Sequence, residues 1–309
     1  DQAETPLHNM DLELERMEMK GAYINFLADI TDQARMEEIF AAYRPQFIFH
    51  AAAYKHVPMV ESNPSEAAKN NILGTRILAN LAMRYKAEKF IMISTDKAVN
   101  PSNVMGATKR VAELYTQSLN GNSSTRFIAT RFGNVLGSNG SVIPRFRDQI
   151  ESGGPVTVTH PEITRFFMTI TEACQLVLEA ACMGNGGDIF VFDMGEQVNI
   201  VNLARNMIRL SGYEPDKDIK IRFIGLRPGE KLHEELFYHF EKNLPTHHPK
   251  IMIAESERMA PHVINGFFHR LEELVKNRDD SEMLRLLKEM VPGFRSTSPV
   301  FKRAYNAVI

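Results

Sequence analysis

Three consecutive side chains bring a hydroxyl, a carboxyl group and an amine to one point of the sequence: Thr95, Asp96 and Lys97. They follow an apolar run, residues 90–93, that is typical of a buried strand, so they would project from a strand end. A lysine that burial keeps neutral can act as a base, and a protonated aspartate beside it can act as an acid. Together they could remove water from carbons next to a ketone; the alternative is an ordinary ion pair on the surface.

A methionine and a lysine, Met105 and Lys109, stand one helical turn apart at the start of the helical pattern over 103–119. In a binding site the Lys109 ammonium would lower the pKa of nearby acids; otherwise it is a solvated helix lysine next to Arg110. Met105 has no ionisable hydrogen and cannot transfer a proton. A hydroxyl bound here must therefore lose its proton by another route, such as Thr95, or Asp96 through a water.

The elements that position these residues alternate along the first half of the chain. Apolar runs predict strands and helical periodicity predicts helices, an order typical of a parallel sheet with helices on both faces. The segment 133–167 is less regular and rich in glycine and proline. The predicted strands are 23–28, 47–53, 89–94, 125–132, 189–192 and 219–224, and the predicted helices are 32–43, 64–85, 103–119, 171–183, 200–211, 258–276 in part and 281–290.

The composition excludes several classes of protein. The 309 residues carry a net charge of −2, without the basic excess of a nucleic-acid-binding protein. No run approaches the ~18–20 apolar residues of a membrane span, and no signal peptide is recognisable. Cys174 and Cys182 are too far apart along one helical pattern to bridge, which suggests a reducing cytoplasm. His247 and His248 lack a further ligand at metal-binding spacing, so we predict a polar loop and no metal site.

Three longer motifs resemble one family. They are HAAAYKHVP at His50–Pro58, STDKAVNPSNVMGATKR at Ser94–Arg110 and RPGEKLHEEL at Arg227–Leu236. In these segments the chain resembles the CapD-like polysaccharide biosynthesis family, the UDP-N-acetylglucosamine 4,6-dehydratases of the extended short-chain dehydrogenase/reductase superfamily. Met105 stands where most of that superfamily has tyrosine, which is similar to the methionine subgroup of the family. The resemblance runs from Asp1 to about Ile253.

The resemblance implies an α/β fold, a Rossmann-like doubly wound parallel sheet with a smaller C-terminal substrate-binding domain. Residues 1–138 would form a partial NAD-binding domain and residues 139–309 mainly the UDP-sugar domain, with 171–200 returning to the Rossmann-like core. The implied reaction converts UDP-N-acetylglucosamine to a UDP-linked 4-keto-6-deoxy sugar. A hydride leaves C4 for NAD, water leaves across C5 and C6, and the same hydride returns to C6.

The resemblance also assigns roles to individual residues. Lys97 would be the base at C5 and Asp96 the acid at the C6 hydroxyl, with Thr95, Met105 and Lys109 completing the catalytic set. The residues implied to bind NAD are Asp1, Asp29, Ile30, Ala51, Ala52, Ala53 and Lys109. The residues implied to bind the UDP-sugar are Lys55, His56, Asn134, Arg145, Arg165, Arg227 and Glu230. Arginine suits a diphosphate because its planar fork makes paired, charge-assisted bonds.

One expected element is missing. A dinucleotide-binding sheet of this type opens with a strand and a glycine-rich turn whose N–H groups bind the pyrophosphate, and the sequence contains no such turn. Asp1 stands where the second strand should end. The chain is therefore predicted to be a C-terminal portion of a longer polypeptide, or a sequence that starts late, with strand 47–51 lacking its usual neighbour. The parent would be a homo-oligomer, tethered to the inner membrane by N-terminal helices, with this portion in the cytoplasm.

Two alternative functions stay open. An NAD-dependent UDP-sugar epimerase would share the cofactor and diphosphate contacts, but it has little use for Asp96 and Lys97 and normally keeps the tyrosine. A non-catalytic nucleotide-sugar binding module is favoured by Met105 and by the missing glycine-rich turn. Product analysis by NMR separates the two enzymes, and NAD(H) released on denaturation separates an enzyme from a binding module.

Overall fold

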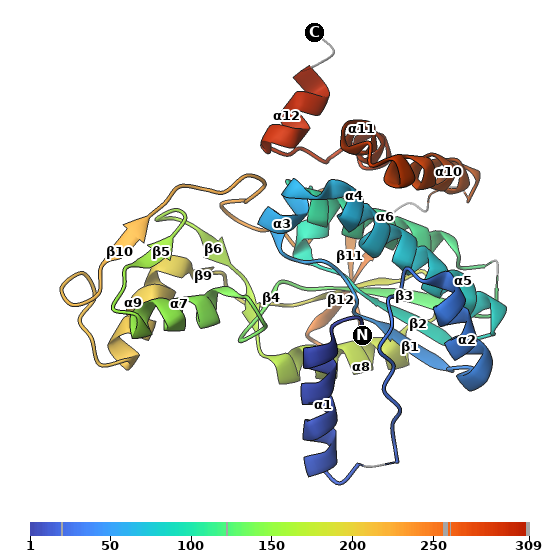
Figure 1. The fold of residues 1–309 in the computed structure, drawn as a ribbon, viewed down its shortest axis with the longest axis horizontal. Coiled ribbons are helices and arrows are strands. Elements are labelled where there is room, and N and C mark those ends of the chain that lie inside the picture. Colours follow the sequence, from blue (N-terminus) through green and yellow to red (C-terminus); the bar gives the residue numbers. More distant parts are fainter. Residues whose placement is uncertain (20, 122, 256–258, 260, 307–309) are drawn as a thin grey trace.

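A six-stranded sheet forms the centre of the molecule (Figure 1). The computed structural model describes residues 1–19, 21–121, 123–255, 259 and 261–306. The first four strands are parallel, whereas β12 is antiparallel to β8 and β11 is antiparallel to β12. The strand order is β1 (Phe47–His50), β2 (Lys89–Ile93), β3 (Arg126–Arg131), β8 (Ile189–Phe192), β12 (Ile251–Glu255) and β11 (Lys242–Pro245). The predicted α/β sheet is confirmed, and a hairpin that the sequence did not predict extends it.

Each face of this sheet has its own hydrophobic core, because successive residues of a strand point to opposite faces. Phe90 and Met92 of β2 lie in the core beneath the first group of helices, and Ile91 lies in the core beneath α8. Helices therefore cover both faces, as the alternation of elements predicted (Figure 1). The first group is α2 (Gln33–Tyr43), α5 (Thr75–Arg84) and α6 (Val104–Ser118), and α8 is Ile170–Met183.

The helix predicted over 64–85 is interrupted by a π-helical turn. It consists of α4 (Pro64–Ala67), the π segment Ala68–Gly74 and then α5. Asn71, in the π segment, clamps the backbone after β1: its Oδ1 accepts from the Tyr54 N–H at 2.8 Å, and its Nδ2 donates to the Tyr54 carbonyl at 3.1 Å. Such turns often mark functional sites, and this one fixes the start of the segment that continues into α3 (Val57–Ser62).

A second body with its own core lies beside the sheet (left in Figure 1). Its helices α7 and α9 pack on two short parallel strands, β5 and β10. The two-stranded pairs β4–β7 and β6–β9 lie between this body and the main sheet in the chain order. We propose that the smaller domain consists mainly of residues 142–165 and 198–223. The bounds are α7 (Val142–Glu151), α9 (Ile200–Leu210), β4 (Asn134–Val135), β5 (Val156–Val158), β6 (Thr164–Arg165), β7 (Phe167–Met168), β9 (Val198–Asn199) and β10 (Ile221–Phe223).

Three C-terminal helices return to the main body. α10 (Pro261–Asn277) and α11 (Asp280–Met290) contribute to the core that contains α4 and α6, and α12 (Pro299–Asn306) packs on α11. Every residue of α6 is consequently buried. Of the helix predicted over 258–276, residues 258 and 260 lie outside the described part. No helix among the described residues is long and apolar enough to cross a membrane.

The N-terminal region departs most from the prediction. Residues 23–28 do not form a strand. The Ala28 N–H donates to the Asp1 carbonyl at 3.0 Å, and the Asp1 amino group donates to the Phe26 carbonyl at 3.1 Å, but these two hydrogen bonds do not make a ladder. Helix α1 (Glu4–Arg16) was not predicted, and none of its residues is buried. In the described chain β1 pairs only with β2, so it forms an edge of the sheet, as expected for a strand without its usual neighbour.

Candidate active site

The segment after β2 turns sharply and fixes Thr95, Asp96 and Lys97 at the strand end. A single 3₁₀ turn begins at Asp96, and the Thr95 hydroxyl oxygen caps it by accepting the Lys97 N–H at 3.4 Å. The same hydroxyl donates to Asp96 Oδ1 at 2.9 Å. The Asp96 N–H donates to the Phe132 carbonyl at 2.9 Å, which ties the turn to the end of β3. The three predicted groups are thus held as one unit.

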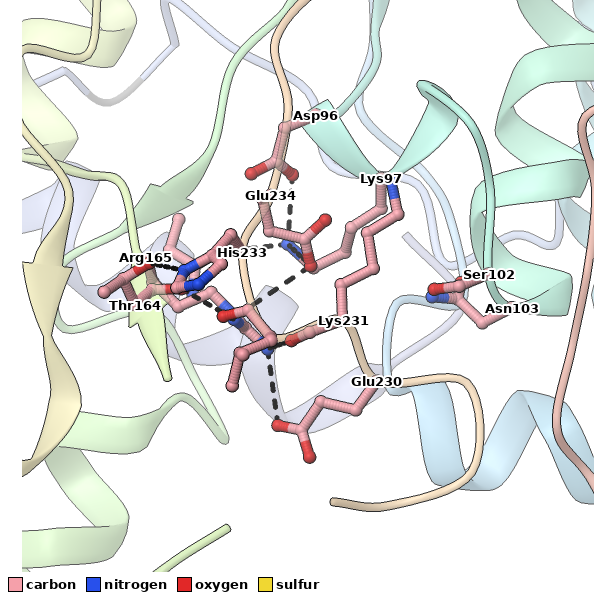
Figure 2. A network of polar contacts seen from close by, with 12 residues as sticks. Asp96, Lys97, Ser102, Asn103, Thr164, Arg165, Glu230, Lys231, His233 and Glu234 are labelled. Carbon is pink, nitrogen blue, oxygen red and sulfur yellow. Dashed lines mark hydrogen bonds and ion pairs between the residues drawn. The ribbon is translucent and has the colours of Figure 1, made fainter. Parts of the chain in front are cut away.

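The Lys97 ammonium lies among three acceptors, of which Figure 2 labels Asp96 and Glu234. Its Nζ is 3.0 Å from Asp96 Oδ1, 3.1 Å from Asn134 Oδ1 and 3.9 Å from Glu234 Oε1. Burial by itself lowers the pKa of Lys97, but the negative charges of Asp96 and Glu234 outweigh burial and raise that pKa above its usual value. The expectation that desolvation leaves Lys97 neutral is therefore wrong for this arrangement, because two carboxyl groups stabilise the ammonium.

Glu234 is the member of this cluster that the sequence did not assign. Its side chain is buried, and burial raises the pKa of its carboxyl group while the Lys97 charge opposes that rise. Glu234 Oε2 and Asp96 Oδ2 are buried without a hydrogen-bond partner among the described residues. The available signal was the HEEL motif, but a second carboxylate at a distance of 137 positions from Lys97 becomes a neighbour only in the fold.

Arg165 holds the segment that carries Glu234. Its guanidinium donates to the carbonyls of Thr164 at 2.6 Å, Lys231 at 2.9 Å and Leu232 at 3.3 Å. It also lies 3.4 Å from Glu230 Oε1. Most of its donors are thereby used inside the protein, so Arg165 positions the wall of the site in addition to bordering the cavity.

A cavity of about 250 Å³ opens beside the cluster. Its cationic side chains Lys55, Arg145 and Arg227 are exposed, and Arg227 lies 3.5 Å from Glu230. Exposed cations in a concave site attract an anionic ligand such as a diphosphate. The residues of the cavity wall include Lys97, Glu234 and all seven residues predicted to bind substrate: Lys55, His56, Asn134, Arg145, Arg165, Arg227 and Glu230.

The turn between Arg227 and Glu230 is fixed by Gly229. Its carbonyl accepts hydrogen bonds from Ser102 Oγ at 2.8 Å and Asn103 Nδ2 at 3.0 Å, and its N–H donates to Thr297 Oγ1 at 3.2 Å. Gly229 has a φ of +77°, a conformation that favours glycine. The cavity wall is therefore joined both to the cap of α6 and to the C-terminal segment.

A second group of predicted residues lies at the end of β1. Lys109 is buried, which lowers the pKa of its ammonium to about 8. Burial, together with the nearby Lys109 charge, lowers the pKa of His50 to about 3, and its neutral ring lies 2.8 Å from Thr75 Oγ1. Met105 is also buried. Lys109 is thus a buried lysine near the end of β1, and its role in binding NAD stays a prediction.

The remaining residues predicted to bind the dinucleotide lie after β1 or in the N-terminal region, where the predicted strand is not formed. Ala51 and Ala52 are exposed and leave room beside β1. The Asp1 carboxylate accepts from its own Ala3 N–H at 2.8 Å, and the Asp29 carboxylate from the Thr31 N–H at 2.8 Å. Ile30 packs against the π segment at Gly74, and Ala53 is half-buried. No glycine-rich turn for a pyrophosphate occurs in the described chain, and the dinucleotide-binding roles of these residues stay predictions.

Buried ion pairs join α6 to β3 and to Glu241, the residue that precedes β11. Arg131, fully buried, is 2.9 Å from Glu113 and 2.9 Å from Glu241. Burial raises the pKa of Glu113, but the charges of Arg131 and Arg110 prevail and lower it to about 2. The Ser94 hydroxyl donates to Glu113 at 2.6 Å. This network fixes the helix that carries Lys109 relative to the strand that precedes Thr95.

Comparison with known proteins identifies relatives over most of the chain. A family model described as “Polysaccharide biosynthesis protein” matches residues 1–256. The capsular polysaccharide biosynthesis protein CapD of Staphylococcus aureus is 52% identical over 265 residues, which are 85% of this chain and 44% of CapD. The chain thus spans less than half the length of that relative.

Two further relatives bear on the site. The UDP-N-acetylglucosamine 4,6-dehydratase (inverting) of Campylobacter jejuni is 36% identical over 262 residues, which are 79% of this chain and 75% of that protein. The X-ray structure of Pen from Bacillus thuringiensis has a TM-score of 0.73 at 36% identity and covers 82% of this chain and 79% of that one. The family match over residues 1–256 includes the strands of the sheet and the residues of the cavity wall.

Proposed function

Because the chain belongs to the CapD-like family of polysaccharide biosynthesis proteins, we propose that it is an NAD-dependent nucleotide-sugar 4,6-dehydratase that acts on UDP-N-acetylglucosamine. The observation that carries the proposal is the Asp96–Lys97–Glu234 cluster at a cavity that also has exposed cationic side chains. An acid and a base suit elimination of water, and exposed cations suit a diphosphate. The Campylobacter relative carries that activity in its name.

The residues of this chain divide the reaction between them. Thr95 can take the proton of the C4 hydroxyl while its own proton passes to Asp96, since the two oxygens are 2.9 Å apart. Thr95 thus takes the proton that a tyrosine would take at position 105, because the Met105 side chain cannot accept or give up a proton. Lys97 then acts at C5, where the new ketone has made the C–H bond acidic. Arg227 and Arg145 bind the diphosphate, which keeps the sugar next to Lys97.

NAD is the proposed cofactor because the two ends of its site are recognisable. Lys109 and Thr95 would contact the nicotinamide ribose end, and Asp1, Asp29 and Ile30 the adenosine end. When bound, NAD supplies a reversible hydride acceptor. The lowered pKa of Lys109, about 8, suits a group that can give up a proton near neutral pH.

The test is product analysis with the full-length protein, NAD⁺ and UDP-N-acetylglucosamine. Mass spectrometry should show loss of one water, and NMR should show a new methyl group at C6 beside a C4 ketone or its hydrate. An epimerase would leave the C6 hydroxyl in place and change only a stereocentre. A product of unchanged mass with an inverted carbon would overturn the dehydratase in favour of that second function.

A further inference from the structure

A second carboxyl group, that of Glu234, lies 3.9 Å from the Lys97 ammonium (Figure 2). We infer that Glu234 is the general acid that protonates the departing C6 hydroxyl, and that it receives its proton from Lys97. The inference rests on the proposed dehydration. It moves the acid role from Asp96, where the family resemblance put it, to a residue in the HEEL motif.

The positions of the two carboxyl groups support this assignment. Glu234 borders the cavity, and its Oε2 has no hydrogen-bond partner among the described residues. Asp96 is fully buried and is not part of the described cavity wall. Its Oδ1 already accepts hydrogen bonds from Thr95 and Lys97. Asp96 Oδ2 also has no partner among the described residues, so the difference lies in position: Glu234 borders the cavity that a ligand would enter, and Asp96 does not.

The charges around Glu234 suit a group that both gains and loses a proton. Its Oε1 lies 3.9 Å from Lys97 Nζ and 3.9 Å from Arg165 Nε. The Gln197 amide donates to the Glu234 backbone carbonyl at 2.9 Å and helps to fix the residue. Burial and the Asp96 charge raise the pKa of Glu234, and they outweigh the opposing charges of Lys97, Arg165 and Lys231. A raised pKa favours the protonated carboxyl group that a general acid needs.

Proton balance gives the strongest reason. Elimination needs a neutral amine at C5 and a protonated acid at C6 at the same time. Transfer of one proton from the Lys97 ammonium to the Glu234 carboxylate creates both groups in a single step. Lys97 then takes the C5 proton, the C–H electrons form the C5–C6 double bond, the C6–O bond breaks, and Glu234 gives its proton to the departing hydroxyl, which leaves as water.

The rest of the cycle restores the starting charges. Lys97 is again an ammonium and Glu234 again a carboxylate when water has left. The hydride removed from C4 returns to C6, and Lys97 returns its proton to C5. The proton of the C4 hydroxyl, held by Asp96, then passes to Lys97 across 3.0 Å. The substrate has lost only the elements of water, and no outside oxidant or reductant is consumed.

The experiment compares Glu234→Gln with the parent in the full-length protein, using UDP-N-acetylglucosamine and its 6-deoxy-6-fluoro analogue. Loss of a general acid should slow dehydration at least ~100-fold. Oxidation at C4 precedes the acid step, so stopped-flow NADH absorbance should keep its transient. Fluoride leaves without needing a full proton, so the deficit of the variant should shrink at least ~10-fold with the analogue. Glu235→Gln, the neighbouring half-exposed carboxylate outside the described cavity wall, should behave as the parent.

The experiment separates a failure of the proposed function from a failure of the proposed role of Glu234. If the parent makes no dehydrated product, the proposed function falls and the role of Glu234 falls with it. If the parent dehydrates the sugar and Glu234→Gln does so within about threefold of it, Glu234 is not the acid but the function stands. An equal deficit with the hydroxyl and fluoro substrates would show a structural role and would also overturn the inference.

Discussion

The surroundings of Lys97 determine when it can act. Three acceptors hold its ammonium, at 3.0 Å (Asp96), 3.1 Å (Asn134) and 3.9 Å (Glu234), and its pKa is raised. A lysine in this state cannot remove a proton from carbon until a neighbouring group has accepted a proton from its ammonium. Asn134 has an amide and cannot do so. The choice between Asp96 and Glu234 is therefore the central chemical question of the site.

At the residue scale, Lys97→Ala should separate oxidation from elimination. Without the amine, exchange of the C5 proton with solvent deuterium should fall by at least ~100-fold, because no other group of the cluster is a strong enough base. NAD⁺ should still be reduced transiently in a single turnover, since Lys109 and Thr95 are intact. Mass spectrometry of deuterium uptake, run beside stopped-flow absorbance, measures both. Exchange at the parental rate would remove Lys97 from the C5 step.

A second residue-scale prediction concerns Arg227. Its side chain is 43% exposed and shares only Glu230 as an ion-pair partner at 3.5 Å among the described residues, so it can turn toward a phosphate. Arg227→Ala should raise KM for the UDP-sugar about tenfold or more, roughly 1.5 kcal/mol of lost charge-assisted bonding. Arg227→Lys should recover only part of it. Arg222→Ala, an exposed arginine of β10 outside the described wall, is the control; equal effects of both alanine variants would place Arg227 outside the site.

At the element scale, Gly229 joins the cavity wall to α6 and to the C-terminal segment. A Cβ there would lie 2.8 Å from Asn103 Cβ, and the φ of +77° would be strained for any side chain. Gly229→Ala should therefore cost about 2–3 kcal/mol of unfolding free energy and raise KM, because Arg227 and Glu230 flank the turn. Gly225→Ala, at φ +82° with nothing within 4 Å of its Cβ, should cost only about 1 kcal/mol. Chemical denaturation compares the two; equal losses would show that the close contact with Asn103 does not matter.

Local patterns were sufficient to predict most elements of the main sheet. Continuous apolar runs mark β2, β3 and β8 because both faces of these strands are buried, and amphipathic periods mark α2, α6 and α9. The hairpin of β11 and β12 was missed since β11 is short, polar and ends in Pro245. Residues 23–28 have a strand-like pattern but no ladder partner in the described chain. Pattern predicts a strand only where a neighbouring strand completes its hydrogen bonds.

The site could be predicted as far as motifs reach, and no further. The family resemblance assigned Lys97, Arg227 and the other substrate residues to one ligand, and the described cavity wall includes all of them, while their roles stay predictions. The charge state of Lys97 was wrong, since it depends on Glu234, which approaches only through the fold. Arg165 was predicted for the ligand, yet its carbonyl contacts show that it also builds the wall. Electrostatics at a buried site is a tertiary property that spacing alone does not encode.

At the scale of the whole molecule, the cavity lies where the main body and the smaller body meet. Lys97 and His56 come from the main body, whereas Arg145 and Thr157 come from the smaller body with its own core. The described wall is thus incomplete in either body alone. A ligand that spans both would stabilise their relative position, as expected of a nucleotide sugar with its sugar at Lys97 and its diphosphate at Arg145.

The other open feature of the whole molecule is the β1 edge of the sheet. In the described chain β1 pairs only with β2, and its Phe47 and Phe49 side chains are 50% and 45% exposed. An exposed edge strand with large apolar side chains pairs readily with another chain.

We expect this 309-residue chain, expressed alone, to self-associate as concentration rises. Phe49→Lys should shift it toward monomer, because a charge at the edge opposes pairing. Phe240→Lys, at a side chain 67% exposed and away from β1, should leave association unchanged. Sedimentation velocity over a range of concentrations measures this; a wild-type chain that is monomeric throughout, or equal association of the Phe49→Lys variant, would show that the β1 edge is not the surface through which copies meet.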